Sequence, residues 1–314
     1  MKKKTKLLII IILFTVITGC TKTLKDDKKV VTNPETGQSL TSNILCQPTD
    51  QKLYDLYQEY DKDLQVQLED LPKCREFTPS KLKYQSLWET LFVKPLGYII
   101  LKLGYLFRDM GLSVMLIGLL IRLILFPLQI KTIKQSEQMK KLQPEMARIE
   151  RKYKDKTDQE SMMMKSQETM ALYKKYKVNP VGGCLSAFIQ LPIFFAFLEA
   201  INRLPAIFEG TFLNTTWNLG MTPGTGIGKG HYTYIILIVL IVGTTWLSFR
   251  NTMASQNQNT EMAQQMKMMT TFMIVMIAVM SFSLPTAIAL YWVVTNGFAV
   301  VQNIIVKKTI GKKD

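Results

Sequence analysis

The stretch that decides the fold runs from residue 110 to residue 130 and reads MGLSVMLIGLLIRLILFPLQI. It is long enough to cross a bilayer as one helix, which needs about 20 apolar residues, and Arg122 is its single charged residue. A lone arginine near the middle of a span costs about 2.5–3.5 kcal/mol on insertion scales, and it persists where it faces water, a partner or a cavity. Snorkelling to the interface is the alternative. Because Lys131 marks the expected edge, Arg122 lies about 13 Å inside it, a depth that favours a functional arginine in a hydrated pocket.

The rest of the chain repeats this contrast between apolar blocks and basic connections. The protein has 314 residues, is 47% hydrophobic and carries a formal charge of +15. A soluble protein with that charge would suggest a nucleic-acid partner. Here the apolar residues form membrane-length blocks with basic residues between them, which indicates an all-α membrane protein. We therefore expect membrane lipids as partners and no DNA, with basic contact to RNA only as a secondary role.

Five transmembrane helices are expected, and the charge of their connections predicts their orientation. Segment 131–178 has thirteen Lys/Arg against seven Asp/Glu, which places it in the cytoplasm. Segment 203–231 carries only Arg203 and Lys229 as basic residues, so it should lie outside, whereas the lysine-rich tail 309–314 should lie inside. The expected spans within the core 110–308 are about 110–131, 181–202, 232–249, 268–284 and 286–306.

The N-terminus is typical of a bacterial signal peptide covering residues 1–19. Four lysines precede a twelve-residue apolar core, Leu7 to Thr18, which is too short for an ordinary span. The run Ile17 to Cys20 resembles a lipobox, so we expect cleavage before Cys20 and attachment of a lipid such as palmitate to it. An uncleaved anchor with a coincidental cysteine is the alternative.

Residues 20–83 are expected to form an extracytoplasmic, lipid-anchored tether. Residues 21–43 are rich in Thr, Lys and Asp, which predicts flexibility. Cys46 and Cys74 fall in a compartment that permits a disulfide, and closing that loop could add about 3 kcal/mol, but the sequence leaves their pairing open. No CxxC pair occurs and His231 is the only histidine. We therefore expect no metal, no cofactor and no enzyme chemistry.

Two further segments are expected to be helical. Residues 84–109 alternate apolar stretches with single basic residues, which predicts an amphipathic helix on the outer membrane surface, kinked at Pro95. Residues 132–178 predict a cytoplasmic helical hairpin in which Thr157 and Glu160 form a capping box. Its basic surface is a candidate contact for a client or a ribosome, or only a topology signal. The basic residues concerned are Lys140, Lys141, Arg148, Arg151 and Lys152.

Three ordered blocks of the sequence resemble YidC-type membrane protein insertases. They are GLSVMLIGLLIRLILFPLQIKTIKQSEQMKKLQPEM at 111–146, NPVGGCLSAFIQLPIFFAFLEAI at 179–201 and MKMMTTFMIVMIAVMSFSLPTAIALYWVVTNGFAVVQN at 266–303. The resemblance covers about residues 84–308. It implies five helices around a groove open to the cytoplasm and to lipid. It also implies insertion of nascent membrane proteins, alone or beside the Sec translocon, with the ribosome as a further partner. Ser186 stands where the family often carries proline, which leaves the local helix shape open.

The same resemblance assigns residues to the substrate groove. The family arginine corresponds to Arg122, and further groove positions correspond to Gln190 and Trp246. A polar side chain inside an apolar span needs a partner or water, so Arg122 and Gln190 are expected to share one hydrated pocket. A transporter with Arg122 as an anion site is the second interpretation, although no inverted repeat is visible. A structural assembly factor is the third.

Overall fold

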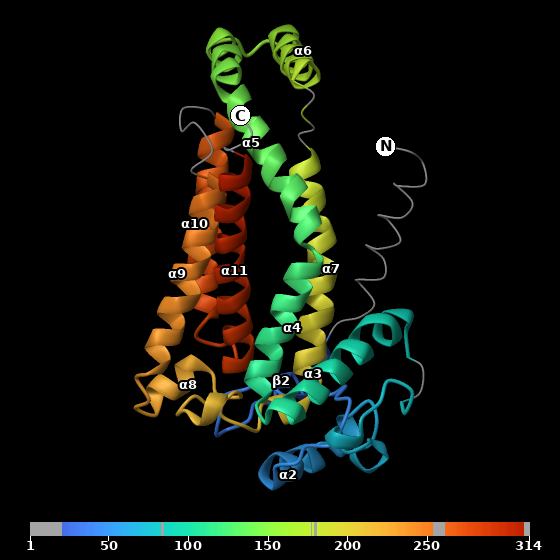
Figure 1. The fold of residues 1–314 in the computed structure, drawn as a ribbon. Helices are drawn as coiled ribbons and strands as arrows, with labels where there is room; N and C mark the ends of the chain where they lie inside the picture. The colour runs from blue at the N-terminus through green and yellow to red at the C-terminus, as the bar shows by residue number, and fades with distance from the viewer. Residues whose placement is uncertain (1–20, 83–84, 177, 179–180, 254–260, 311–314) are drawn as a thin grey trace. The chain divides into compact units, whose positions relative to one another are not determined.

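The structure is a computed structural model that describes residues 21–82, 85–176, 178, 181–253 and 261–310 (Figure 1). Some side chains within these ranges lie outside the description, at residues 140, 181–190, 251–253, 261–263, 266 and 310. The chain divides into two compact units. The first unit comprises residues 1–120, 190–241 and 279–294, and the second comprises residues 121–189, 242–278 and 295–314. Each unit is described by itself.

Helices dominate the described residues, and one small hairpin supplies the two strands. The longer helices are α2 Gln51–Glu59, α3 Lys94–Phe107, α4 Met110–Ile124, α5 Phe126–Lys152, α6 Gln159–Lys175, α7 Val181–Asn202, α9 Tyr234–Met253, α10 Glu261–Met280 and α11 Thr286–Ile310. The six-residue helix α8 is Pro223–Gly228. Strands β1 Lys25–Asp26 and β2 Lys29–Val30 pair antiparallel.

Several of these helices are apolar enough to enter a membrane. By length and composition alone, the segments Glu89–Phe107 and Thr286–Thr309 could cross one. A third crossing is possible if Met110–Ile124 and Phe126–Met139, which meet at a 60° bend, form one span. Shorter apolar helices among the described residues are Leu191–Asn202, Tyr234–Arg250 and Lys267–Met280. The fold is thus mostly helical and suited to a membrane, while the count of five spans stays a prediction.

The N-terminal part of the first unit is folded around a core of its own. Leu24, Leu40 and Ile44 are at most 3% exposed and pack with Leu53 and Tyr57 of α2. The main chain is paired as well, because the N–H of Leu24 donates to the carbonyl of Leu40 at 2.8 Å. Residues 21–43 therefore belong to a packed core instead of the expected flexible tether.

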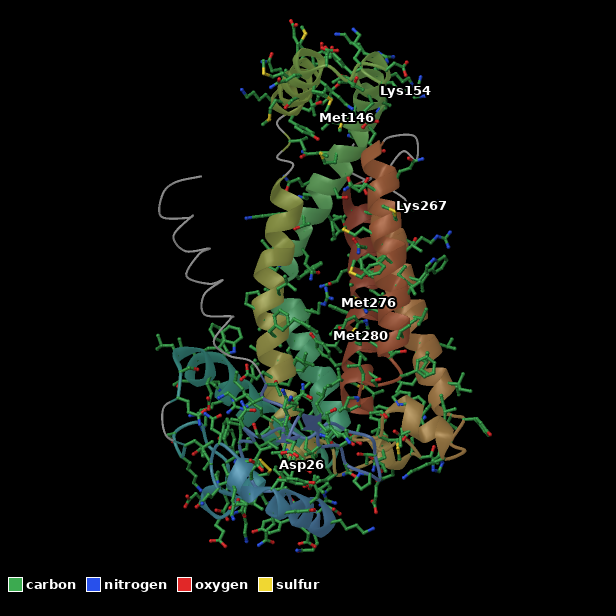
Figure 2. The ribbon with its side chains drawn as sticks, turned by 180° about the vertical axis from the view of Figure 1, so that it is seen from behind. Asp26, Met146, Lys154, Lys267, Met276 and Met280 are labelled. Carbon is green, nitrogen blue, oxygen red and sulfur yellow. A yellow bond between two sulfur atoms is a disulfide. The ribbon has the colours of Figure 1, made fainter. Side chains whose placement is uncertain are left out.

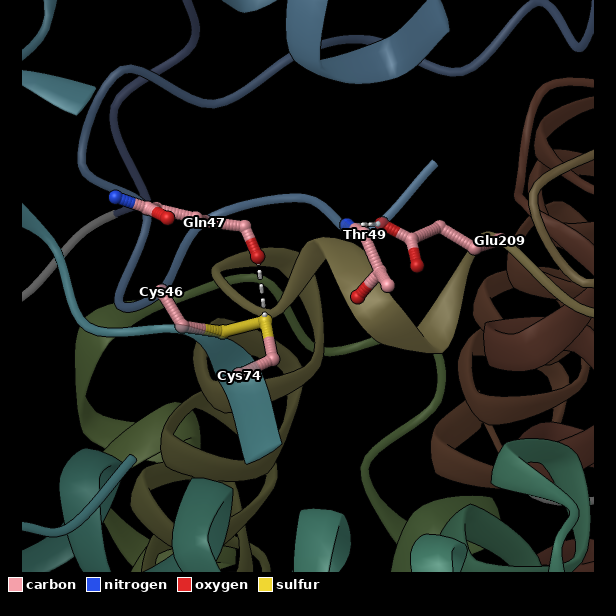
Figure 3. Close-up of a disulfide and its surroundings, with 5 residues drawn as sticks. All are labelled: Cys46, Gln47, Thr49, Cys74 and Glu209. Atoms are coloured by element: carbon pink, nitrogen blue, oxygen red, sulfur yellow. Dashed lines mark hydrogen bonds between the residues drawn. A yellow bond between two sulfur atoms is a disulfide. The ribbon is translucent and has the colours of Figure 1, made fainter. Parts of the chain in front are cut away.

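A disulfide joins Cys46 and Cys74, which answers the pairing that the sequence left open (Figure 3). Both cysteines are buried, at 0% and 2% exposure. The chain around them is held by main-chain contacts, since the N–H of Gln47 donates to the carbonyl of Pro72 at 2.9 Å. The loop that the bond closes contains α2 and two short 3₁₀ turns, Asp61–Asp63 and Leu68–Asp70.

One side of helix α3 is buried against other parts of the first unit. A π-helical turn, Glu89–Val93, precedes it, and Pro95 lies in its first turn. In its middle, a β-carbon added to Gly97 would stand 3.3 Å from the Leu204 side chain. Toward its end, the guanidinium of Arg75 lies 5.8 Å from the Tyr105 ring. This helix is therefore fixed to the residues on both sides of the disulfide loop and to the segment after α7.

In the second unit, α5 and α6 pack against each other through a small apolar core. Leu142 is fully buried, and Met146, Leu172, Tyr173 and Val178 pack with it; Met146 lies on α5, and Lys154 lies beyond the end of that helix (Figure 2). The N-cap of α6 differs from the prediction. Asp158, not Thr157, caps the helix by accepting a hydrogen bond from the N–H of Ser161. A carboxylate at this position is as good a cap as a hydroxyl and also interacts favourably with the helix dipole.

Candidate functional site

Arg122 lies on α4, two residues before the helix ends, and its side chain is half-buried. The residues that follow it, Leu123 and Ile124, are 51% and 74% exposed. The arginine is therefore partly covered, while the next positions of the same helix present apolar side chains outward. The expectation of a hydrated arginine rests on this partial burial within an apolar helix.

The helix breaks two residues after Arg122, within the expected span of about 110–131, and the sequence analysis did not predict this bend. Helix α4 ends at Ile124, α5 begins at Phe126, and the two meet at 60°. Pro127 in the first turn of α5 explains the break, because it lacks an N–H and its ring clashes with the carbonyl four residues earlier. A proline inside an apolar run was the signal for this bend.

Three polar side chains of the second unit lie within apolar helices, and the sequence analysis did not single them out. Gln302 on α11 is 2% exposed, and its Nε2 donates to the main-chain oxygen of Arg122 at 3.4 Å. Asn296 on α11 donates from Nδ2 to Oγ1 of Thr245 on α9 at 3.1 Å, and Thr245 is 2% exposed. Polar residues in the apolar run VVTNGFAVVQN were the available signal. They give the second unit a polar interior among its apolar helices.

Trp246 lies beside Thr245 on α9 but faces a different environment. Its side chain is 47% exposed, and the guanidinium of Arg250 lies 5.1 Å from the centre of its ring. Val239 and Leu247 on the same helix are also exposed. Trp246 is thus part of an outward apolar surface with a cation at its edge, which suits contact with lipid or with an apolar client segment.

Gln190 lies on α7, but its side chain is outside the described residues. The pocket expected between Gln190 and Arg122 therefore stays a prediction. Cys20 also lies outside the described residues, so its lipid attachment stays a prediction too.

The predicted basic contact surface lies on α5. Lys141, Arg148, Arg151 and Lys152 are exposed, and Lys152 also pairs with Glu168 of α6; the side chain of Lys140 is not described. Nearby, the Tyr176 hydroxyl donates to Glu145, and Lys175 lies 3.5 Å away. The Tyr176 hydrogen bond, aided by Lys175, holds the pKa of Glu145 below its ordinary value. The surface of the α5–α6 pair is thus basic, and two of its acidic residues, Glu145 and Glu168, are engaged in contacts between the two helices.

The first unit contains a buried cluster of four charged residues that the sequence analysis did not foresee. Arg203 is 2% exposed and lies 3.0 Å from Glu199 and 3.2 Å from Glu89. Lys94 is 1% exposed and lies 3.5 Å from the same oxygen of Glu89, and the indole of Trp88 donates to Glu199 at 2.9 Å. Two cations and two anions give the cluster no net charge. It fastens the start of α3 to the end of α7, and each member alone would be costly to bury.

Another carboxylate of this unit, that of Glu209, contacts the segment before α2. Glu209 accepts a hydrogen bond from the main-chain N–H of Thr49 at 2.6 Å, near the start of α2 (Figure 3). Burial raises the pKa of Glu209, and the N–H groups of Thr49 and Asp50 offset part of that effect. In the part of the chain that the structure describes, no group of His, Cys, Asp and Glu is arranged to hold a metal ion.

Comparison with known proteins places these features in a family. Residues 102–313 match the family of the 60Kd inner membrane protein. The chain is 36% identical to a protein of Oceanobacillus iheyensis named membrane protein insertase YidC, over 77% of this chain and 93% of that one. It is 39% identical to membrane protein insertase MisCA of Bacillus subtilis, over 72% and 82% of the two chains, and 38% identical to YidC 2 of Bacillus anthracis, over 74% and 87%.

The chain therefore belongs to the YidC family of membrane protein insertases. The matched residues include α4, α5 and the helices through α11, and they therefore include Arg122, Trp246 and the polar residues around them. The disulfide-bonded loop, residues 46–74, precedes the residues that match the family, which begin at residue 102.

Proposed function

We propose that this protein inserts newly synthesised membrane proteins into the bilayer and helps them fold, alone or with the Sec translocon. Relatives that match most of the chain carry the name of membrane protein insertase. The observation that carries the mechanism is the half-buried Arg122 in an otherwise apolar helix. It is supported by the buried polar side chains of Thr245 and Gln302 in the same unit.

The proposed mechanism needs no nucleotide. A new apolar span gains free energy on entering lipid, so the barrier lies in moving its polar flank across. A hydrophilic groove formed by the five spans and lined by Arg122 and Gln190 lowers this free-energy barrier, because the polar flank stays partly hydrated while it crosses. An acidic flank is also attracted to the guanidinium, and the attraction is stronger there than in water because the effective dielectric constant is lower.

The contacts of α3 support its placement on the outer surface, although its length also permits a span. Before its start, Glu89 contacts Arg203; after its end, Asp109 accepts a hydrogen bond from the N–H of Leu213. Arg203 and Leu213 belong to one connection between α7 and α9. A 14-residue helix is about 21 Å long, and both of its ends meet this same connection. A surface helix satisfies these contacts, whereas a spanning helix would place them on opposite sides of the bilayer.

The proposed topology has five spans, with the segment 203–231 and the N-terminal part outside and the α5–α6 pair and C-terminus inside. The charge bias of the connections supports it. A lipid on Cys20 would anchor the N-terminal part at the outer surface. The α5–α6 pair is then available to the ribosome, whose RNA attracts exposed basic residues such as Arg148 and Arg151.

Insertion in vitro tests the proposal most directly. The purified protein is placed in liposomes and given a single-span client whose translocated flank is acidic or neutral. Arg122→Ala should abolish protection of the acidic client from protease, Arg122→Lys should retain part of it, and the neutral client should suffer less. Leu123→Ala is the matched control on the same helix. Full insertion of the acidic client by Arg122→Ala would contradict the role of the arginine. Failure of the wild-type protein to insert either client would favour an assembly factor, and anion flux would favour a transporter.

Thiol labelling tests the groove separately. Single cysteines at positions 122 and 190, with Cys184 replaced, should react with an impermeant reagent supplied on the cytoplasmic side. Leu123→Cys, on the exposed apolar side of α4, should face lipid and stay unreactive. Unreactive cysteines at both 122 and 190 in a folded protein would contradict a hydrated groove.

Deletion tests the role of the α5–α6 pair. Residues 136–176 form most of this pair, whose apolar core is its own, so a short linker can replace them. Loss of ribosome binding with unchanged topology would support recruitment. Unchanged insertion and ribosome binding would leave the basic residues as a topology signal alone.

A further inference from the structure

Among the described amide side chains of the second unit, Gln302 is the most deeply buried, and it contacts a helix end. It is 2% exposed, and its Nε2 lies 3.4 Å from the main-chain oxygen of Arg122. Its Oε1 is buried and has no hydrogen-bond partner among the residues that the structure describes. An amide that donates on one side and has an unused acceptor on the other points to a site whose second half is filled from elsewhere.

The Arg122 carbonyl is where a helix needs an outside donor. The last four carbonyls of a helix have no N–H partner within it, and α4 ends at Ile124. The chain then turns by 60° into α5, so the helical hydrogen-bond pattern does not continue regularly past the end of α4. Because a carbonyl only accepts, the contact also orients Gln302: Nε2 faces Arg122 and Oε1 faces away.

We propose that Gln302 is a positioning residue for Arg122, which rests on the proposed insertase function. The amide holds the main chain at the break between α4 and α5, so that the guanidinium of Arg122 is held in one direction. The Oε1 atom accepts a hydrogen bond from water in the groove. Gln302 acts through Arg122 and need not touch the client.

The chain offers a matched control at the next position. Asn303 is also an amide on α11, but its Nδ2 donates to the carbonyl of Ala299 in its own helix, at 3.0 Å. Gln302→Leu and Asn303→Leu each remove one amide from the same helix. Only the first removes the donor to Arg122. Gln302→Met, unbranched and of similar length, is the second variant if Gln302→Leu does not accumulate.

The first measurement is the ratio of insertion of acidic-flank to neutral-flank clients in liposomes. Gln302→Leu should lower this ratio about tenfold, the usual effect of one lost hydrogen bond that matters for the reaction. Asn303→Leu should leave it unchanged. For the neutral-flank client, which the Arg122→Ala variant still inserts, combining Gln302→Leu with Arg122→Ala should give no further loss beyond Arg122→Ala alone, because both changes remove the same interaction. Equal losses for both clients, or additive losses in the double variant, would overturn the proposal.

The second measurement does not depend on insertion. Arg122→Cys, with Cys184 replaced and the Cys46–Cys74 bond intact, is labelled with an impermeant thiol reagent with and without Gln302→Leu. The labelling rate should change when Gln302 is replaced and should not change with Asn303→Leu. A labelling rate insensitive to Gln302 would overturn the positioning role. If Arg122→Ala itself inserts acidic clients normally while labelling still responds to Gln302, the proposed function of the arginine fails and the structural link stands.

Discussion

Arg203 and Arg122 are both arginines near the end of a membrane-associated helix, but their surroundings differ. Arg203 is 2% exposed and contacts the carboxylates of Glu199 and Glu89. Arg122 is half-buried on a helix without any acidic residue, and its main chain is held by the amide of Gln302. The first arginine is neutralised and fixed, which suits a structural joint. The second is less deeply buried, as the proposed contact with a client requires.

Replacing each arginine by methionine should separate the two roles and give the largest effect on stability. Arg203→Met leaves Glu89 and Glu199 buried with only Lys94 to balance them. Breaking one side of a buried ion pair costs about 3–5 kcal/mol. The thermal unfolding temperature in detergent should fall clearly for Arg203→Met and hardly at all for Arg122→Met. Equal unfolding temperatures would show that the Arg203 cluster is not a joint.

Removing the disulfide should destabilise the N-terminal part by about 3 kcal/mol, from the chain entropy of the loop that it closes. The two cysteines are 28 positions apart. In the variant carrying Cys46→Ala and Cys74→Ala, limited proteolysis should become faster within residues 21–82 and stay unchanged in the α5–α6 pair. Cys184→Ala is the control. Uniformly faster cleavage of the whole chain would mean that the disulfide stabilises more than its own loop.

Asp109 is expected to have a smaller effect, because it joins only two main-chain groups. Its carboxylate accepts from the N–H of Leu112 at the start of α4 and from the N–H of Leu213. Loss of a helix cap costs about 1–2 kcal/mol, so Asp109→Ala should lower the unfolding temperature modestly. Asp109→Asn keeps one acceptor oxygen, so its unfolding temperature should lie between those of the wild-type protein and Asp109→Ala. An unchanged temperature for Asp109→Ala would show that other groups hold Leu213.

The smallest effect concerns pH and should have opposite signs in the two units. The pKa of Glu145 is lowered by Tyr176 and Lys175, so its contribution is present above the ordinary carboxyl value and is lost as the pH falls through the lowered pKa. The pKa of Glu209 is raised by burial, so its ionised form weakens folding, and acidification relieves that cost.

Hydrogen exchange measured between pH 7 and about pH 4 checks this contrast. After correction for the intrinsic pH dependence of amide exchange, acidification should lower protection in the α5–α6 pair and raise it in residues 43–59 of the first unit. Glu145→Gln should remove the pH response of the α5–α6 pair alone, and Glu209→Gln should remove that of residues 43–59 alone. Responses of the same sign in both regions would contradict the assigned pKa directions.

The sequence was informative where the signal is local. The apolar runs and the charge of their connections were sufficient to predict a helical membrane protein, and the resemblance of three sequence blocks predicted its family. The break at Pro127 was also readable, because proline acts within one helical turn. The N-cap at Asp158 was missed by one position, since Thr157 and Asp158 are both good caps and packing decides between them.

Contacts between distant residues were not readable from the sequence. Nothing local in residues 21–43 indicates a packed core, because the leucines meet only where the chain folds back on itself. In the sequence, Arg203 is one basic residue of a loop, and only the folded structure shows that Glu89, in the turn before α3, lies beside it. Gln302 is 180 positions from Arg122. The sequence by itself determined which segments are helical, apolar and charged, because periodicity and hydropathy are properties of neighbouring residues. Only the tertiary structure decided which charges are neutralised and which amide holds the arginine, because those pairings depend on the path of the whole chain.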